Sequence, residues 1–147
     1  METLMGVKLT IRKIENKKEL EEIISIRKEV FVKEQNVPEG MEIDGEDDKA
    51  IHVIVLLGKK PIGCARIRII DNRAKLERIS ILKEYRGNGY GKDLVEFLIK
   101  FCLDKKVKEI YMHAQYYLKD FYSDLEFVES GSVFAEAGIK HIEMVYK

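Results

Sequence analysis

The chain has 147 residues, 46% apolar and 35% charged, a composition typical of one soluble globular domain with its own core. Its 26 basic and 26 acidic side chains cancel, so overall charge favours neither nucleic acid nor a membrane surface as a partner. No apolar run approaches the roughly 20 residues that cross a bilayer, and residues 1–6 lack the pattern of a secretory signal. We therefore expect a single cytoplasmic domain over residues 1–147, without a nucleic-acid or membrane partner.

The first half of the chain predicts a strand, a helix and three further strands. Lys8–Ile14 alternates as a strand does, and apolar residues then recur at helical spacing from Leu20 to Phe31, until Gln35–Pro38 ends the helix. Turns at Gly58–Pro61 and Asp71-Asn72 separate the strands that follow. These strands are Ile51–Leu57, Ile62–Ile70 and Ala74–Leu82.

The second half predicts two helices and three strands. They are the helix Gly89–Asp104, the strand Glu109–Ala114, the short helix Leu118–Leu125 and the closing strands Phe127–Phe134 and Ile139–Tyr146. The sum is an α/β (α+β) domain with a central, mostly antiparallel mixed sheet and helices on both faces.

Cysteine and histidine spacing gives no sign of a metal site. Cys64 and Cys102 are far apart and lie inside apolar patterns, which favours buried thiols over a disulfide. His52, His113 and His141 each fall in an expected strand, where no second ligand stands at the spacing of a zinc site. We expect structural histidines and no metal, with His113 on the strand face that also carries Gln115.

An acidic segment follows Pro38. The spacing of its carboxylates does not fit a calcium loop, so it is either a solvated connection or a surface that attracts a cationic amine to a nearby cleft. Its acidic residues are Glu39, Glu42, Asp44, Glu46, Asp47 and Asp48.

The glycine-rich segment Arg86–Gly91 lies between a strand and a helix. Its three glycines permit positive φ and let successive N–H groups point into one concavity, at the positive end of a helix. With Arg86 and Lys92 on either side, this is a phosphate site. A P-loop would need glycine at 86 and Ser or Thr at 93, where Arg86 and Asp93 stand, and a dinucleotide fingerprint would need glycine where Lys92 stands.

The pattern Arg-x-x-Gly-x-Gly at this place resembles the pyrophosphate-binding motif of the GNAT superfamily of acetyl-CoA-dependent N-acetyltransferases. The order of elements resembles the GNAT fold over essentially the whole chain, and Glu77–Ile81 resembles the family's fourth strand with its bulge. The resemblance implies acetyl-CoA as cosubstrate, with the backbone of Ile79 and Ile81 bonding its pantetheine arm. The residues implied in binding it are Ile79, Ser80, Ile81, Arg86, Gly87, Asn88, Gly89, Tyr90, Gly91, Lys92, Gln115 and Tyr122.

Tyr122 is the candidate general acid. Gln115-x-x-Leu118-x-x-x-Tyr122 resembles the family pattern Asn-x-x-Ala-x-x-x-Tyr, in which the tyrosine lies near the cofactor sulfur and can protonate a leaving thiolate. The family's Gly-Phe pair after this tyrosine is Glu126-Phe127 here. Glu126 is therefore expected to take an unfavourable φ or to lengthen the turn.

Glu77 is the candidate general base, since strand alternation places it on the side of Ile79 and Ile81 and since some family members, glucosamine-phosphate N-acetyltransferases among them, use a glutamate on this strand. The alternative is an exposed ion-pair partner of Lys75 and Arg78. The N–H of Ile81 is the expected oxyanion donor.

The acceptor pocket is expected at the end of the first helix. Val30–Pro38 and Gly138–Met144 resemble stretches of a small branch of bacterial GNAT proteins. The residues expected to contact the acceptor are Phe31, Glu34, Gln35 and His113, although Phe31 in the core and a helix-capping polar pair remain an alternative.

The resulting expectation is an N-acetyltransferase that transfers the acetyl group to a primary amine by direct attack in a ternary complex. The acceptor is open among polyamines, aminosugars, amino acids, drugs and protein lysines, and exposed sheet edges leave a homodimer open. Two alternatives stand beside it: an acyl-CoA-binding regulatory module without turnover, and an acyltransferase with a longer acyl donor.

Overall fold

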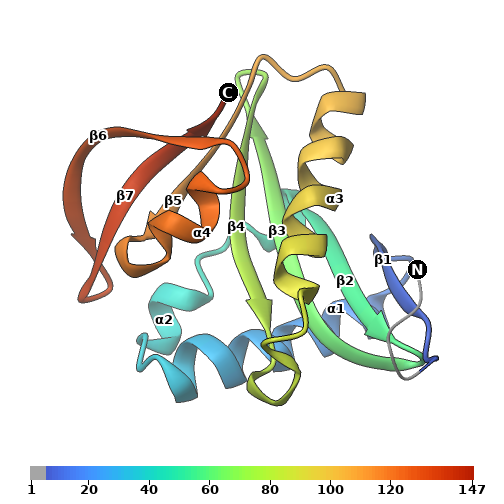
Figure 1. Ribbon diagram of the computed structural model, residues 1–147. Coiled ribbons are helices and arrows are strands. Elements are labelled where there is room, and N and C mark those ends of the chain that lie inside the picture. The colour runs from blue at the N-terminus through green and yellow to red at the C-terminus, as the bar shows by residue number, and fades with distance from the viewer. Residues whose placement is uncertain (1–5) are drawn as a thin grey trace.

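The computed structural model describes residues 6–147, which form one seven-stranded sheet in the order β1-β2-β3-β4-β5-β7-β6 (Figure 1). Within these residues β4 and β5 are parallel neighbours, and the other neighbouring pairs are antiparallel. The strands are β1 (Leu9–Lys13), β2 (Ile51–Leu57), β3 (Lys60–Ile70), β4 (Arg73–Ile81), β5 (Glu109–Gln115), β6 (Phe127–Glu136) and β7 (Ile139–Tyr146). The expectation of no secretory signal concerns the first residues of the chain, and residues 1–5 lie outside the described part.

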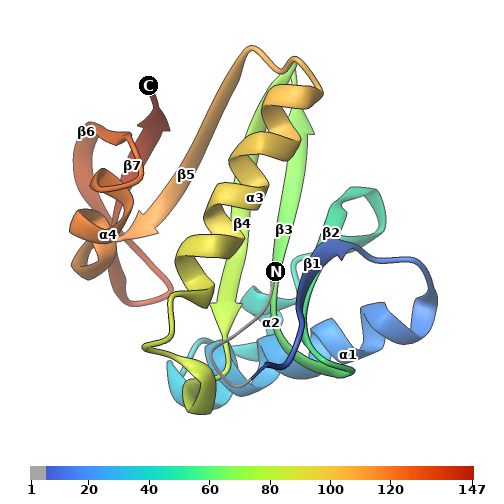
Figure 2. The ribbon, with the colours of Figure 1, turned by 45° about the vertical axis from the view of Figure 1, so that its right-hand side comes forward.

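Helices cover both faces of the sheet, as expected (Figures 1 and 2). The first of them starts where Asn16 accepts a hydrogen bond from the N–H of Glu19. It continues as a π-helical turn, Lys28–Glu34, to the predicted end at Gln35. The α-helices are α1 (Lys17–Arg27), α2 (Glu39–Glu42), α3 (Tyr90–Asp104) and α4 (Lys119–Ser123).

Two apolar clusters hold these layers together. On one face α3 and α4 pack on the sheet, with Leu94 and Leu98 of α3 fully buried. On the other face Ile23 of α1 packs against Ile54 and Cys64. Cys64 and Cys102 are both buried and free, which confirms the expected thiols.

The turn between β2 and β3 is shorter than predicted. Lys60 pairs with Leu57 and Pro61 with Leu56, so both residues belong to β3 and only Gly58 and Lys59 form the turn. Proline is tolerated here because the ladder is already irregular between Val55 and Leu56.

A bulge in β4 changes which side chains share a face. The register against β3 shifts between Cys64 and Arg66, and Arg78 takes a φ of +54°. Past this point the alternation changes phase: Ile79 and Ile81 pack on the α3 side, whereas Glu77 turns to Arg66. The expectation that Glu77 shares a side with Ile79 and Ile81 is therefore wrong.

The bulge also lies where β4 leaves its parallel neighbour. Arg73–Leu76 pairs with Glu109–Met112, and beyond these residues the two strands draw apart (Figure 2). The C-terminal half of β4 therefore has a ladder partner only on its β3 side.

Buried arginines tie α1 to the segment that contains α2. The side chain of Arg27 is 0% exposed; its Nε donates to Glu42 Oε1 at 2.9 Å and its Nη1 donates to Asp47 Oδ1 at 2.7 Å. Arg66 of β3, also 0% exposed, donates to both oxygens of Asp44, to Asp47 and to Glu77. These bonds join two elements and a loop that lie far apart in the sequence.

Neither expectation for the acidic segment holds for all of its residues. Glu42, Asp44 and Asp47 are not free to attract a cation, because Arg27, Arg66 and Arg78 hold their carboxylates, and Glu42 is buried as well. We call Arg27, Arg66, Arg68, Arg78, Glu42, Asp44, Asp47 and Glu77 the arginine network.

Glu126 takes the first of the two conformations expected for it. Its φ is +74°, its N–H donates to the carbonyl of Ser123, and its own carbonyl accepts from the N–H of Lys147. The chain therefore turns tightly out of α4 without the glycine that suits this conformation.

Replacing Glu126 by glycine should stabilise the fold. A side chain in the left-handed region costs about 1–2 kcal/mol, and the greater freedom of unfolded glycine offsets part of the gain, so we expect about 0.5–1 kcal/mol in urea unfolding. Glu129→Gly, at an exposed position of β6, is the matched control and should destabilise. A loss of stability in Glu126→Gly would contradict the strain at this turn.

Replacing Asp47 by asparagine should destabilise the fold in a pH-dependent way. Burial acts to raise the pKa of Asp47, but bonds from Arg27 and Arg66 outweigh it and hold this pKa below its ordinary value. The stabilisation is therefore complete above about pH 4 and is lost as the pH falls through the lower folded pKa. At pH 7 we expect a loss on the order of 3 kcal/mol, because two buried arginines lose a carboxylate.

The control for Asp47→Asn is Asp48→Asn, since Asp48 is exposed and forms no ion pair within residues 6–147. Its free energy of unfolding should stay within about 0.5 kcal/mol of the wild type. The gap between wild type and Asp47→Asn should narrow from pH 5 to pH 2, and a gap independent of pH would contradict the pairing.

Candidate active site

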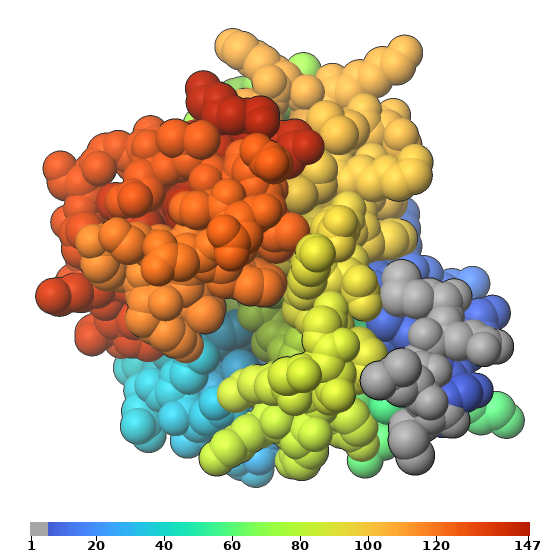
Figure 3. All heavy atoms as spheres, in the orientation of Figure 1, coloured from blue at the N-terminus to red at the C-terminus, as the bar shows by residue number. Residues whose placement is uncertain are grey.

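A cavity of about 180 Å³ opens where β4 and β5 separate. The surface is hollowed there between the C-terminal part of the chain, the segment around α2 and the loop before α3 (Figure 3). Residues from several parts of the fold line it, among them Phe31, Gln35, Met41, Glu77, Arg78, Ile79, His113, Gln115, Tyr122, Glu136 and His141.

Tyr122 of α4 reaches this cavity with its side chain held from both sides. The rings of Phe121 and Phe127 meet it edge-on, with centroids at 5.0 Å and 6.1 Å. Burial raises the pKa of Tyr122 above its ordinary value, so the phenol is neutral at pH 7. Within residues 6–147 its hydroxyl has no hydrogen-bond partner. It is a protonated donor available to a ligand.

The glycine loop has the conformation that the sequence requires. Gly87 and Gly89 both have a φ of +83°, and Gly89 caps α3. An added Cβ at either would meet nothing within 4 Å, so the backbone angle is what requires glycine there. Asn88 Nδ2 donates to the carbonyl of Tyr85 at 3.1 Å, and the first N–H groups of α3, which starts at Tyr90, have no intrahelical acceptor.

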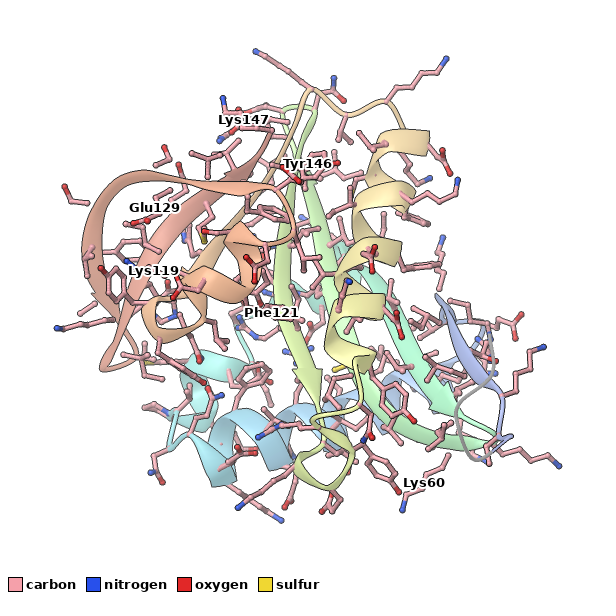
Figure 4. The ribbon with its side chains drawn as sticks, viewed as in Figure 1. Lys60, Lys119, Phe121, Glu129, Tyr146 and Lys147 are labelled. Atoms are coloured by element: carbon pink, nitrogen blue, oxygen red, sulfur yellow. The ribbon has the colours of Figure 1, made fainter. Side chains whose placement is uncertain are left out.

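Two contacts support this loop from outside. The ring of Phe121 lies toward the start of α3, 3.8 Å from where a Cβ on Gly91 would stand (Figure 4). Lys60 Nζ lies 5.4 Å from the centroid of the Tyr85 ring.

Arg86 does not offer the free charge expected of it. Its Nε donates to the carbonyl of Ile81 at 2.8 Å, and its two Nη atoms donate to Glu34 at 2.6 Å and 2.9 Å. Glu34 is therefore paired beside the glycine loop and does not line the cavity. The Arg86–Glu34 ion pair ties this loop to the π-helical turn. Lys92, in the first turn of α3, takes no part in this pair.

The backbone of Ile79 and Ile81 faces the open side of β4. The N–H of Leu82 donates to Ile62 of β3, so by antiparallel alternation Ile81 directs its own N–H and carbonyl away from β3. Ile79, two residues earlier, follows the same alternation. Ser80 points the other way, and its Oγ lies 3.2 Å from the Sγ of Cys64.

Glu77 does pair with Arg78, at 3.9 Å, as the alternative to a base expected, but it is not exposed. It is 9% exposed, and its carboxylate accepts hydrogen bonds from Arg66 and Arg68. Burial acts to raise its pKa, but the two arginines outweigh burial and hold the pKa below its ordinary value. Such a carboxylate is a weak base.

Three of the four residues expected at the acceptor line the cavity. They are Phe31, Gln35 and His113. Gln115 Nε2 donates to Gln35 Oε1 at 2.8 Å, which joins β5 to the end of the π-helical turn. His113 Nε2 lies 3.4 Å from Glu143 Oε1.

His141 of β7 also lines the cavity, although its sequence context predicted only a structural histidine. The signal was its place in Gly138–Met144, a segment that was noted only as a resemblance. The register that sets His141 opposite Gln115 became visible with the pairing of β5 and β7. Arg66 and Arg78 were missed for the same reason, because their partners Glu42, Asp44 and Asp47 lie at least 19 residues away in the sequence.

Within residues 6–147 no group of three or more His, Cys, Asp or Glu side chains is arranged to hold a metal ion. No helix of the described part has the length and apolar content needed to cross a membrane.

Comparison with known proteins relates the chain to one family. Residues 13–147 match the family described as acetyltransferase (GNAT) domain. The uncharacterized N-acetyltransferase YjcF of Bacillus subtilis is 38% identical over 131 residues, which cover 88% of this chain and 94% of YjcF. The crystal structure of Escherichia coli ElaA superposes with a TM-score of 0.85 at 25% identity, over 95% of this chain and 99% of that one.

A more distant structure shares the fold. It is a GNAT family acetyltransferase from Elizabethkingia anophelis with acetyl-CoA bound. It superposes with a TM-score of 0.69 at 14% identity, over 93% of this chain and 94% of that one.

Proposed function

The chain belongs to the GNAT acetyltransferase family, and we propose that it transfers the acetyl group of acetyl-CoA to a primary amine by direct attack, with both substrates bound. The observation that carries the proposal is the cavity between the separated halves of β4 and β5, which Tyr122 lines and the glycine loop adjoins. Cys64 and Cys102, both free and buried, support a reducing compartment such as the cytoplasm for this activity.

The residues present fit acetyl-CoA as the donor. The N–H groups of Gly87–Lys92, at the positive end of α3, suit a pyrophosphate. The side of β4 that β5 leaves open at Ile79 and Ile81, where the carbonyl of Ile81 already accepts from Arg86, suits a peptide-like arm. Arg86 enters the proposal as the residue that fastens this loop to Ile81 and Glu34, because those bonds occupy its guanidinium.

The protein has three tasks in this reaction. It must accept a proton from the amine, stabilise the negative charge that the attack of the neutral amine places on the thioester oxygen, and stabilise the leaving thiolate. Tyr122, a neutral phenol without a partner, donates a hydrogen bond to the sulfur as charge develops there. The N–H of Ile81 is the proposed donor to the oxyanion.

Glu77 is proposed as a positioning residue. Its two arginine partners make it a weak base, and through Arg66 it shares the arginine network with Asp44 and Asp47. The acceptor is proposed to lie against Phe31, Gln35 and His113, and Glu34 is left out because Arg86 holds it.

Acetyl-CoA should stabilise the protein through the glycine loop. At about 100 times its dissociation constant it adds roughly 2.7 kcal/mol, a rise of several degrees in Tm, and CoA should act likewise whereas ATP and NAD should not. Gly89→Ala strains a φ of +83° and should reduce the shift, whereas Gly40→Ala, at an unstrained and open position, should leave it unchanged. An equal shift with ATP would contradict the assignment of this loop.

Tyr122→Phe should slow turnover while leaving donor binding intact. We expect kcat to fall by about 10²-fold, measured as thiol release from acetyl-CoA with a panel of primary amines, because the donor to the sulfur is lost. Tyr117→Phe is the matched control, since Tyr117 is 70% exposed and does not line the cavity.

The same assay separates the alternatives. Acetyl-CoA binding without thiol release for any amine would indicate a regulatory module, and faster release from octanoyl-CoA than from acetyl-CoA would indicate a longer acyl donor. Full activity in Tyr122→Phe would contradict the role of the phenol.

A further inference from the structure

His141 stands in the cavity between two other strands. It pairs with Gln115 of β5 on one side and with Phe134 of β6 on the other, and only 9% of it is exposed. Its ring stacks on that of Phe134, with centroids at 5.8 Å and planes at 25°. The orientation of the imidazole is therefore fixed by the sheet before any ligand enters.

The hydrogen bonds of this ring define its tautomer. Nδ1 lies 2.8 Å from the carbonyl oxygen of Ile139, and because a carbonyl oxygen only accepts, Nδ1 carries the hydrogen. In the neutral ring the lone pair is then on Nε2. Within residues 6–147 no group donates to or accepts from Nε2, so the lone pair is unused.

Two other candidate bases of the cavity already have charged partners. Glu77 is held by Arg66 and Arg68. The two nitrogens of His113 face carboxylates, with Nε2 at 3.4 Å from Glu143 and Nδ1 at 3.9 Å from Glu136. The Nε2 of His113 is therefore already engaged with the Glu143 carboxylate.

We infer that His141 is the catalytic base of the acceptor half-site, a role that rests on the proposed transfer to an amine. Nε2 takes a proton from the ammonium form of the amine, and the lone pair this frees forms the new C–N bond at the thioester carbonyl. The nitrogen then loses a second proton, which passes to the leaving sulfur. The C–S bond then breaks, and the electron pair leaves on the sulfur, which Tyr122 faces from the same cavity. The imidazolium returns its proton to solvent after the amide departs.

Several elements contribute titratable groups to the cavity that His141 lines. From β4 the cavity receives Lys75, Glu77 and Arg78, from β5 His113, from α2 Glu42, from α4 Tyr122, and from the end of β6 Glu136. Glu42 and Glu77 are matched by arginines of the network, which leaves Glu136 and Lys75 as the groups of opposite sign that line the cavity outside that network.

The test compares His141→Gln with His113→Gln, a second histidine of the same cavity. The probes are benzylamine, which is mostly protonated at pH 7, and hydroxylamine, which is mostly neutral. For benzylamine we expect His141→Gln to lower kcat/KM by about 10²-fold and to remove the fall in rate toward acid pH that a base produces. For hydroxylamine the loss should be under about tenfold, and His113→Gln should retain the acid limb with both probes.

A second measurement does not depend on the acceptor. Nitrogen-15 NMR of histidine-labelled wild-type protein should show His141 with hydrogen on Nδ1 and a bare Nε2 near neutral pH. Hydrogen on Nε2 with a bare Nδ1 would overturn the inference, as would an unchanged benzylamine profile in His141→Gln.

Failure of the proposed function would look different. If wild-type protein releases no thiol with either amine, the transfer reaction itself fails. If wild type is active and His141→Gln matches it at every pH, the reaction stands and the role of His141 falls. The Tm shift with acetyl-CoA, expected to be equal in wild type and His141→Gln, shows that the variant still folds and binds the donor.

Discussion

The bulge at Arg78 is the constraint on which the rest of the structure depends. It holds a non-glycine residue in the left-handed region, a strain of about 1–2 kcal/mol that only a well-determined surrounding can maintain. The surrounding is the arginine network, since Arg78 donates to the carboxylate and the carbonyl of buried Glu42. Because one extra residue enters β4 there, Ile79 and Ile81 join the α3 core while Glu77 joins the network. The same stretch of β4 loses β5 as a neighbour, which leaves a strand edge inside the molecule and not at its rim.

In this arrangement the paired charged groups have a structural role, and two unpartnered polar groups are left for a ligand. The network pairs its carboxylates with arginines, so these groups hold α1, the segment around α2 and β4 in place and contribute little free charge to the cavity. Tyr122 and His141 pack against aromatic rings, and each presents one polar atom without a partner in the described part of the chain. Breaking a buried ion pair is far more damaging than losing a surface pair, so the network is suited to rigidity, and the two unpartnered groups are suited to a ligand.

Local chemistry made much of the fold predictable. The strands Ile51–Leu57 and Ile139–Tyr146 have the predicted ends, and Asp71 and Asn72 form their turn with positive φ, as short polar residues do. The glycine loop and the awkward turn at Glu126 were also predictable, because each follows from what one residue type allows. The change in which β4 side chains share a face was not predictable, because a bulge leaves no mark on the periodicity of the sequence. Nor were the partners of Arg66 or the position of His141, because strand order and register decide both.

The central claim is that the separated half of β4 and the start of α3 together hold acetyl-CoA. The most direct measurement is amide hydrogen exchange of the wild-type protein with and without CoA, resolved to single residues. The account predicts new protection at Gly87–Lys92 and at Ile79 and Ile81, two sites joined by one extended ligand. Protection confined to Gly87–Lys92 would show that this loop is only a general phosphate site. Protection along β1 and the far end of α3, with none at Ile79 and Ile81, would contradict the claim.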